Sequence, residues 1–312
     1  MFLSALISTI FTLVAYNCEN LFDCRHDSLK EDTEFLPDGP RQWTPHRYWT
    51  KLNNVCKVIM ACGTDGDEQR IPDLIALVEV ENDSVLQALT RRSPLRALRY
   101  DYLMTSSPDE RGMDVALLYA PPTFRPLSHR SLRVPPPPGS RPSRDVLYVC
   151  GEIQRGDTLH VFVIHAPSRV GGPAADDYRM RVGQTVAHAV DSIRRLSADA
   201  KVILAGDFNE PLNGEVVGLL GYCHLQDLTK SARGVNGAKA TYRYKGDWEM
   251  LDHVLISPSL SANFRHIRIE DSSFLTEEDR DYGGLKPRRT YVGRRYHGGI
   301  SDHLPLVVIF DF

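Results

Sequence analysis

The sequence of 312 residues predicts an α/β fold in which two β-sheets pack face to face and helices cover their outer faces. Two observations lead to this prediction. Apolar runs bounded by turn residues recur along the chain, and continuous apolar runs are typical of strands that are covered on both faces. Segments with helical spacing separate the runs in mixed order, which favours a layered fold.

The length allows one large domain or two ordinary ones. We predict a single domain over residues 1–312, because the same pattern continues on both sides of the only low-complexity stretch, the prolines at 135–138. These prolines predict a rigid surface turn. The predicted strands cover residues 11–16, 74–78, 101–104, 115–119, 146–151, 160–164, 202–205, 251–256, 265–269 and 306–310.

Three segments carry apolar residues at helical spacing. The first covers residues 45–60 and follows Thr44, a predicted N-cap, with Pro45 at the first helical position. The others cover residues 83–91 and 178–196, and the last is long and amphipathic.

The net charge of −3 gives no global positive field, so a polyanionic substrate would have to be met by local basic patches or by metal ions. The six cysteines show neither C-x-x-C spacing nor a zinc pattern, and we expect them to be mostly reduced. Cys18 with Cys24, or Cys56 with Cys62, could pair in an oxidising compartment.

The first fifteen residues are apolar and contain no charged side chain. They lack the basic start of a secretory signal and are too short to span a bilayer, so residues 11–16 are better explained as the first core strand. Residues 1–10 leave open the remnant of a signal segment. Both a cytoplasmic and an exported protein therefore stay open.

An Asp-His pair, Asp302 and His303, follows a glycine turn and precedes the last apolar run. A carboxylate beside an imidazole can bind a metal ion and move a proton, and phosphate-ester hydrolysis requires both. By itself the pair is equally well explained as ordinary turn residues. The hypothesis therefore depends on partners elsewhere in the chain.

Oxygen donors follow two of the predicted strands. Asn17 and Glu19 follow the first strand and share one face of an extended chain, since they are two residues apart. Glu79 follows a buried run, where an unpaired carboxylate would be costly, so we expect a cationic partner such as a metal ion. Such oxygen donors suit Mg²⁺ or Mn²⁺.

Acid–base groups stand at three further strand ends. His165 is a candidate donor to a phosphate oxygen or leaving group, although most such histidines are structural. Asp207 and Asn209 share a face after Gly206, which allows a close backbone approach. Asp252 begins a strand, where it could orient an imidazole.

Taken together and in order, six motifs resemble those of the endonuclease/exonuclease/phosphatase superfamily. They are Tyr-Asn-x-Glu-Asn-Leu-Phe, Leu-x-Glu-Val-Glu-Asn, His-x-Pro-Ser-Arg, Gly-Asp-Phe-Asn, Leu-Asp-His-Val-Leu-Ile and Ser-Asp-His-Leu-Pro, spanning residues 16–305. The resemblance implies a four-layer α/β/β/α sandwich with two mixed, mostly antiparallel sheets. It also implies one metal-dependent site between the sheet edges.

Carried over residue by residue, the resemblance implies that Glu79 is the principal metal carboxylate. Glu19 and Asp302 would be further ligands of Mg²⁺ or Mn²⁺. Asn17 and Asn209 would position the phosphate or the nucleophile.

The same resemblance implies the acid–base roles. Asp207 would orient or deprotonate the attacking water. His303, paired with Asp252, would act as a general base or stabilise the pentavalent phosphorus. His165 would stabilise the phosphate or protonate the leaving group.

Two segments, residues 35–52 and 274–299, resemble only a bacterial branch of the superfamily. The second is the most basic part of the chain and also carries tyrosines, so we predict that Arg289 and Tyr291 bind a nucleic-acid backbone with bases stacked nearby. The alternative is a solvated loop. Arg111 is a predicted phosphate contact, with Asp114 as an alternative salt-bridge partner.

We therefore predict a divalent-metal-dependent phosphodiester hydrolase, a nuclease that cleaves DNA or RNA by in-line attack of an activated water. A phosphomonoesterase or a lipid or inositol phosphodiesterase on the same centre is the alternative, and an inactive binding protein is a third. The chain lacks the elements that the resemblance implies for inositol polyphosphate phosphatases and for abasic-site repair enzymes. We expect a monomer without a membrane span.

Overall fold

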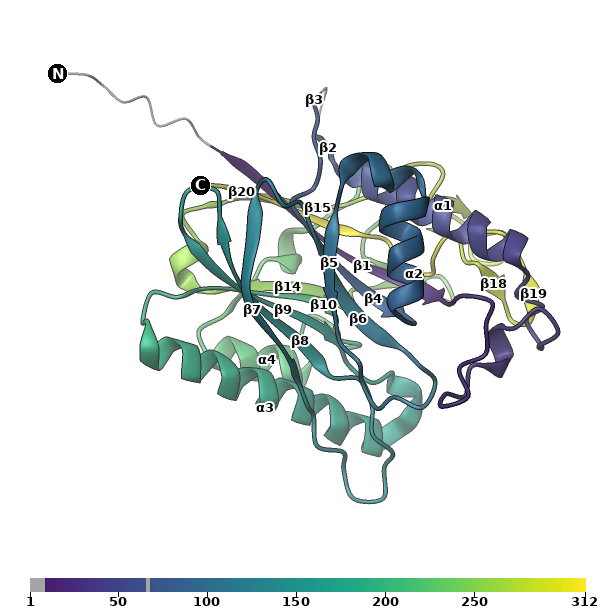
Figure 1. Cartoon of the computed structure of the whole chain (residues 1–312), viewed down its shortest axis with the longest axis horizontal. Coiled ribbons are helices and arrows are strands. Elements are labelled where there is room, and N and C mark those ends of the chain that lie inside the picture. The colour runs from purple at the N-terminus through teal and green to yellow at the C-terminus, as the bar shows by residue number, and fades with distance from the viewer. Residues whose placement is uncertain (1–8, 66–67) are drawn as a thin grey trace.

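The computed structural model describes residues 9–65 and 68–312 and confirms the predicted layered fold (Figure 1). Two large sheets pack face to face, with the strand orders β15-β20-β1-β4-β6-β5 and β11-β14-β10-β9-β8-β7. Within the described residues each sheet has one parallel pair, β1 with β4 and β10 with β9, and its other pairs are antiparallel. Both sheets are therefore mixed and mostly antiparallel.

The strands of the first sheet are β1 (Ile10–Leu21), β4 (Leu74–Val80), β5 (Asp101–Met104), β6 (Asp114–Tyr119), β15 (Phe264–Ile269) and β20 (Leu306–Asp311). Those of the second are β7 (Phe124–Leu132), β8 (Val146–Ile153), β9 (Thr158–His165), β10 (Lys201–Asp207), β11 (Gln226–Asp227) and β14 (Asp252–Ile256). Two-stranded hairpins are β2 (Thr64–Asp65) with β3 (Glu68–Gln69), β12 (Tyr242–Tyr244) with β13 (Asp247–Glu249), β16 (Thr276–Glu278) with β17 (Leu285–Pro287), and β18 (Tyr291–Val292) with β19 (Arg295–Tyr296).

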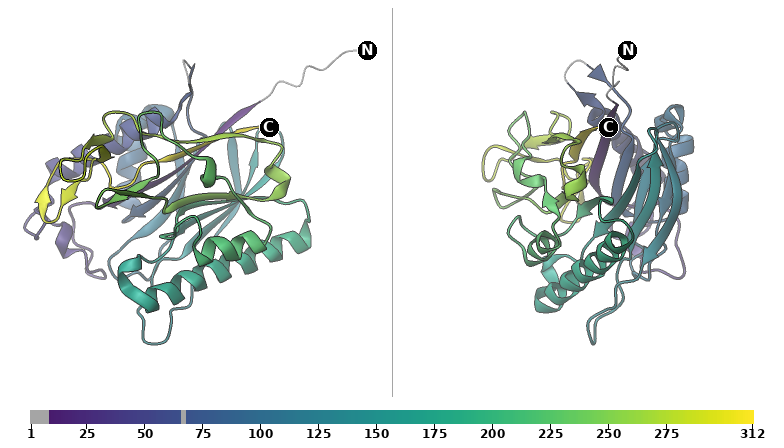
Figure 2. Two further views of the ribbon diagram at one scale, coloured as in Figure 1. Left: turned by 180° about the vertical axis from the view of Figure 1, so that it is seen from behind. Right: turned by 90° about the vertical axis from the view of Figure 1, so that its left-hand side faces the viewer.

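Helices form the two outer layers (Figure 2). They are α1 (Pro45–Cys62), α2 (Asp83–Gln87), α3 (Gly172–Leu196) and α4 (Glu215–Tyr222), and a π-helical turn, Ala88–Arg92, continues α2. The first two cover the first sheet, and the last two cover the second. Thr44 caps α1 as predicted, because its side chain accepts a hydrogen bond from the backbone N–H of Arg47 at 3.4 Å.

The core follows from the alternation of side chains along the strands. On β9 and β10, Val163 and Ala205 face the first sheet, while Phe162 and Leu204 face α3 and α4. All four are fully buried, and burial of each large apolar side chain contributes about 1.5–3 kcal/mol. The predicted runs without polar positions are thus strands with packing on both faces.

The short hairpin strands and three further elements, β7, β11 and α4, were not predicted. Edge strand β7 is mostly polar and exposed and contains Pro126, so it shows no apolar run. Strand β11 has only two residues, and helix α4 has eight. Short or exposed elements carry a weak periodic signal.

Within the described part of the chain all six cysteines are free, so neither Cys18 and Cys24 nor Cys56 and Cys62 are paired. Among the same residues, no helix combines the length and the apolar character needed to cross a bilayer. Residues 1–8 of the segment considered as a signal remnant lie outside the described ranges.

Candidate active site

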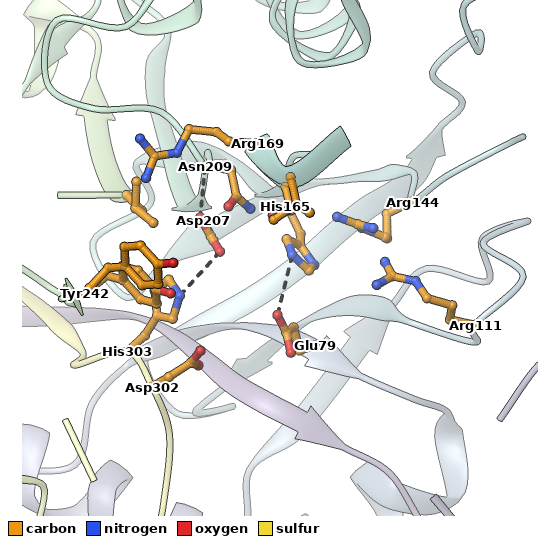
Figure 3. A pocket seen from close by; sticks show the side chains of 14 residues that line it. Glu79, Arg111, Arg144, His165, Arg169, Asp207, Asn209, Tyr242, Asp302 and His303 are labelled. Carbon is orange, nitrogen blue, oxygen red and sulfur yellow. Dashed lines mark hydrogen bonds and ion pairs between the residues drawn. The ribbon is translucent and has the colours of Figure 1, made fainter. Parts of the chain in front are cut away.

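The candidate active site lies where strands of both sheets end at one edge of the sandwich. A pocket of about 480 Å³ opens there (Figure 3). Seven of the predicted site residues line it: Glu79, Arg111, His165, Asp207, Asn209, Asp302 and His303. The structure therefore brings together side chains that are far apart in the sequence.

Strand register places the acid–base groups side by side. Asp207, the last residue of β10, pairs with His165 on β9 and with Asp252 on β14. Gly206 has a φ of +138°, and a Cβ atom there would lie 2.0 Å from the carbonyl oxygen of Ile164. Only glycine fits this approach, which fixes the backbone immediately before Asp207.

His303 contacts two buried carboxylates. Its Nδ1 lies 2.7 Å from Asp252 Oδ2, and its Nε2 lies 3.9 Å from Asp207 Oδ2. Burial opposes the charged imidazolium, but the charges of Asp252 and Asp207 raise the pKa of His303 well above its ordinary value. Burial, together with the charge of Asp252, raises the pKa of Asp207. His303 and the two carboxylates therefore form a buried cluster of interacting charges.

Asn17 connects the two halves of the site. Its Nδ2 donates to Glu79 Oε1 at 3.1 Å and to Asp207 Oδ2 at 3.0 Å, and its Oδ1 accepts from the backbone N–H of Glu19 at 2.8 Å. The side chain is buried beneath the pocket. In the structure Asn17 therefore contacts two carboxylates, and its role in positioning the phosphate or the nucleophile stays a prediction.

Several site residues adopt a strained backbone. Glu19, Asn20, Glu79 and Asn209 all have positive φ values, between +49° and +61°. Each such non-glycine residue costs on the order of 1 kcal/mol, and strain of this kind concentrates at functional sites. At Glu79 it interrupts the register of β4 and lets the carboxylate accept from the backbone N–H of Asn20 at 2.8 Å.

The predicted metal ligands are three carboxylates with different surroundings. Glu79 and Asp302 line the pocket, and Asp302 lies 3.8 Å from the Arg289 guanidinium. Glu19 is deeper, where it accepts from the backbone N–H of Thr290 at 2.6 Å, and burial followed by the charge of Asp302 raises its pKa. The oxygen-only donor set fits a hard divalent ion such as Mg²⁺ or Mn²⁺.

A second group could also hold an ion, because ligand atoms of Asp207, Asp252 and His303 lie within 4.8 Å of one another. In that group Asp252 and His303 are already hydrogen-bonded to each other. The predicted metal ligands Glu19, Glu79 and Asp302 do not belong to this group.

His165 and two arginines form the basic side of the pocket. Burial, Arg144 and Arg111 lower the pKa of His165 well below its ordinary value, so the imidazole is neutral. Its Nε2 lies 3.8 Å from Glu79 Oε1, and its Nδ1 has no hydrogen-bond partner among the described residues. A neutral imidazole can donate a hydrogen bond to a phosphate oxygen, depending on its tautomer.

Arg144 was not predicted. It is buried, donates to the carbonyl of Ala166 at 3.0 Å and to Asp109 at 3.2 Å, and lines the pocket. It stands in the loop before β8, where no local pattern distinguishes it from other arginines. Arg111 contacts the same Asp109 at 3.5 Å and has a half-exposed guanidinium.

Two predictions need correction. Asp114 is not the partner of Arg111, because its carboxylate accepts hydrogen bonds from Thr105 and Ser107. The ring of Tyr291 is not a stacking surface, because it is buried against Trp43 and Tyr296.

Tyr291 is further covered by a cation. The Arg41 guanidinium lies 4.8 Å from its ring centre, and the Tyr291 hydroxyl donates to the Arg41 carbonyl at 2.9 Å. The aromatic side chains that line the pocket are instead Tyr244, which is exposed, and Tyr242, which is half-buried; both lie on β12 and were not predicted. Arg289 lies 5.3 Å from the ring centre of Tyr242, outside the lining of the main pocket.

A smaller depression of about 310 Å³ adjoins the main pocket. The two share Glu79 and Asp302, and the smaller one also contains Arg41, Arg289 and Tyr291. Glu79 and Asp302 therefore border two hollows, each with arginines in its wall.

This fold and this pocket define a metal-dependent phosphoric ester hydrolase. The chain belongs to the Endonuclease/Exonuclease/phosphatase family, whose profile matches residues 12–311. No curated protein matches the sequence.

Solved structures share the fold at low sequence identity. An endonuclease/exonuclease/phosphatase from Bacteroides vulgatus is 14% identical with a TM-score of 0.64, over 97% of this chain and 98% of that one. D. rerio TDP2 in complex with a single-strand DNA product is 15% identical with a TM-score of 0.59, over 97% and 100%. A mannosyl-6-phosphatase from Bacteroides thetaiotaomicron is 16% identical with a TM-score of 0.58, over 97% and 100%.

Proposed function

We propose that the enzyme is a phosphodiesterase that acts on DNA or RNA with Mg²⁺ or Mn²⁺. The observation that supports this proposal is that Glu79 and Asp302 border two hollows with arginines in their walls. A phosphodiester carries a substituent on each side of the phosphorus and needs room on both sides, whereas a monoester needs room on one. Arginines beside the attacked phosphate suit a chain of phosphates.

In this proposal the protein groups have separate tasks. Glu79 and Asp302 would hold the ion, which offsets charge on the phosphate when bound. Arg111 and Arg144 bind phosphate oxygens from the basic side of the pocket.

The acid–base residues complete the reaction. Asp207, held by Asn17, orients the attacking water, and the Asp207 and His303 pair accepts its proton. Neutral His165 donates a hydrogen bond to the phosphate or the leaving group.

A phosphomonoesterase is the second candidate. The arginines Arg111, Arg144 and Arg169 all gather in the main pocket, and such a cluster also suits a dianionic terminal phosphate. One structural neighbour is itself a mannosyl-6-phosphatase.

The experiment compares four substrates: plasmid DNA, a 5′-labelled RNA oligonucleotide, bis(p-nitrophenyl) phosphate and p-nitrophenyl phosphate. Each is incubated with Mg²⁺, Mn²⁺ or EDTA, and the His303→Ala variant is the negative control. We expect metal-dependent cleavage of a nucleic acid and of the diester. Cleavage of the monoester alone would overturn the phosphodiesterase, and full activity in EDTA would overturn the metal requirement.

A further inference from the structure

A lysine ammonium lies buried beneath the carboxylates of the site. Lys51, on α1, is 1% exposed, and its Nζ lies 3.8 Å from Glu19 Oε2. The Nζ also donates to Thr290 Oγ1 at 2.6 Å and to the carbonyl of Ile300. A buried ammonium is costly without such partners, so these contacts explain how its charge is held there.

The same contacts connect α1 to the segment that carries Asp302. The backbone N–H of Thr290 donates to the Glu19 carboxylate, and the Thr290 hydroxyl lies 3.3 Å from the carbonyl of Ile300. Asp302 follows Ile300 by two residues. Lys51 therefore lies at the junction of Glu19 and the backbone that positions Asp302.

The charges around the carboxylates limit what else can bind. Glu19, Glu79 and Asp302 carry three negative charges, and Lys51 and Arg289 each place a positive charge within 4 Å of one of them. The remaining charge is −1, so a single divalent ion already more than offsets it. A second ion at Glu19 would lie beside a buried ammonium, where repulsion is weakly screened.

We propose that Lys51 is a positioning residue that serves Glu19 as a built-in cation and limits these three carboxylates to one divalent ion. The proposal rests on the metal-dependent function proposed above. It goes beyond that function because it says that a residue outside the pocket determines how many ions the site binds.

The first test counts Mn²⁺ ions by equilibrium dialysis and isothermal titration calorimetry on the full chain. We expect Lys51→Met to bind one more Mn²⁺ per chain than the wild type. The additional ion should be lost in the double variant Lys51→Met with Glu19→Gln. Lys57→Met, which removes an exposed lysine from the same helix, is the matched control and should bind as many ions as the wild type.

The difference between variants is the decisive quantity, because any ion held by Asp207, Asp252 and His303 contributes equally to all of them. A merely structural role for Lys51 would lower the unfolding temperature and leave the ion count unchanged. Equal counts in the wild type and in folded Lys51→Met would overturn the proposal.

The second test requires no variant and so does not depend on the folding of Lys51→Met. Crystals of the wild type are soaked in Mn²⁺, and anomalous scattering locates the ions. We expect one peak at these carboxylates. Two such peaks would overturn the role of Lys51 and leave the proposed function intact, whereas no Mn²⁺ binding in either test would overturn both.

Discussion

The Nδ1 of His303 lies 2.7 Å from Asp252 Oδ2, and this contact fixes which ring nitrogen faces the pocket. Because the carboxylate is buried and held on β14, it both orients the ring and stabilises its charged form. The Nε2 is thereby directed toward Asp207.

We expect Asp252→Asn to lower kcat on bis(p-nitrophenyl) phosphate by about 10²-fold or more, because the imidazole loses its orientation and its stabilising charge. Steady-state kinetics with Mg²⁺ or Mn²⁺ measure the effect. Asp271→Asn is the control, since Asp271 is equally buried but accepts backbone hydrogen bonds outside the site. If kcat of the Asp252→Asn variant stayed within a few-fold of the wild-type value, Asp252 would have no part in the mechanism.

Glu79→Gln should weaken Mn²⁺ binding by at least about tenfold, because the principal carboxylate of the proposed ion is lost. Calorimetric titration measures the affinity directly, without reference to activity. Glu278→Gln removes an exposed carboxylate on β16 and should bind Mn²⁺ as the wild type does. An unchanged Mn²⁺ affinity in Glu79→Gln would contradict this ligand role and indicate that the ion binds at the cluster of Asp207, Asp252 and His303.

Arg111→Gln should raise KM for a phosphodiester by about tenfold and change kcat less, because a half-exposed guanidinium contributes mainly to phosphate binding. Initial rates over a range of substrate concentrations separate the two constants. Arg155→Gln, at an exposed turn between β8 and β9, serves as the control. A loss of kcat without a change in KM would instead indicate that Arg111 contacts the phosphate mainly in the transition state.

The fold should show a pH dependence from the buried pair of His253 and Asp227, whose Nδ1 and Oδ2 lie 3.3 Å apart. Burial opposes both charges, but the pairing raises the pKa of His253 and lowers that of Asp227. Because the pKa of His253 is raised in the folded protein, its contribution to stability is fully present below about pH 6.5. This contribution is lost as pH rises through the pKa of His253 in the folded protein. A lowered aspartate pKa stabilises above about pH 3.9 and is lost as pH falls.

We therefore expect the unfolding free energies of the wild type and His253→Gln to differ most between about pH 4 and pH 6.5, and to converge at higher pH. Urea unfolding at several pH values measures this difference. His188→Gln, at an exposed position of α3, should show no such trend. A difference that grows from pH 6 to pH 8 would contradict the assignment.

The sequence by itself determined the layered fold and the ends of the strands that carry chemistry. Apolar runs and turn residues are local signals, and residues such as Glu79 and Asp207 are recognisable because each stands within two residues of the end of such a run. The polar edge strand β7 has no such signal, which is why it was not predicted.

Only the tertiary structure decided which side chains meet. Asn17 reaches Glu79 and Asp207 across 62 and 190 positions of sequence, and it became a bridge between carboxylates because the two sheets pack at that edge. The packing of distant segments also places Arg144 in the site and buries Tyr291 outside the main pocket. Such contacts depend on how distant segments pack, and no local pattern records that packing.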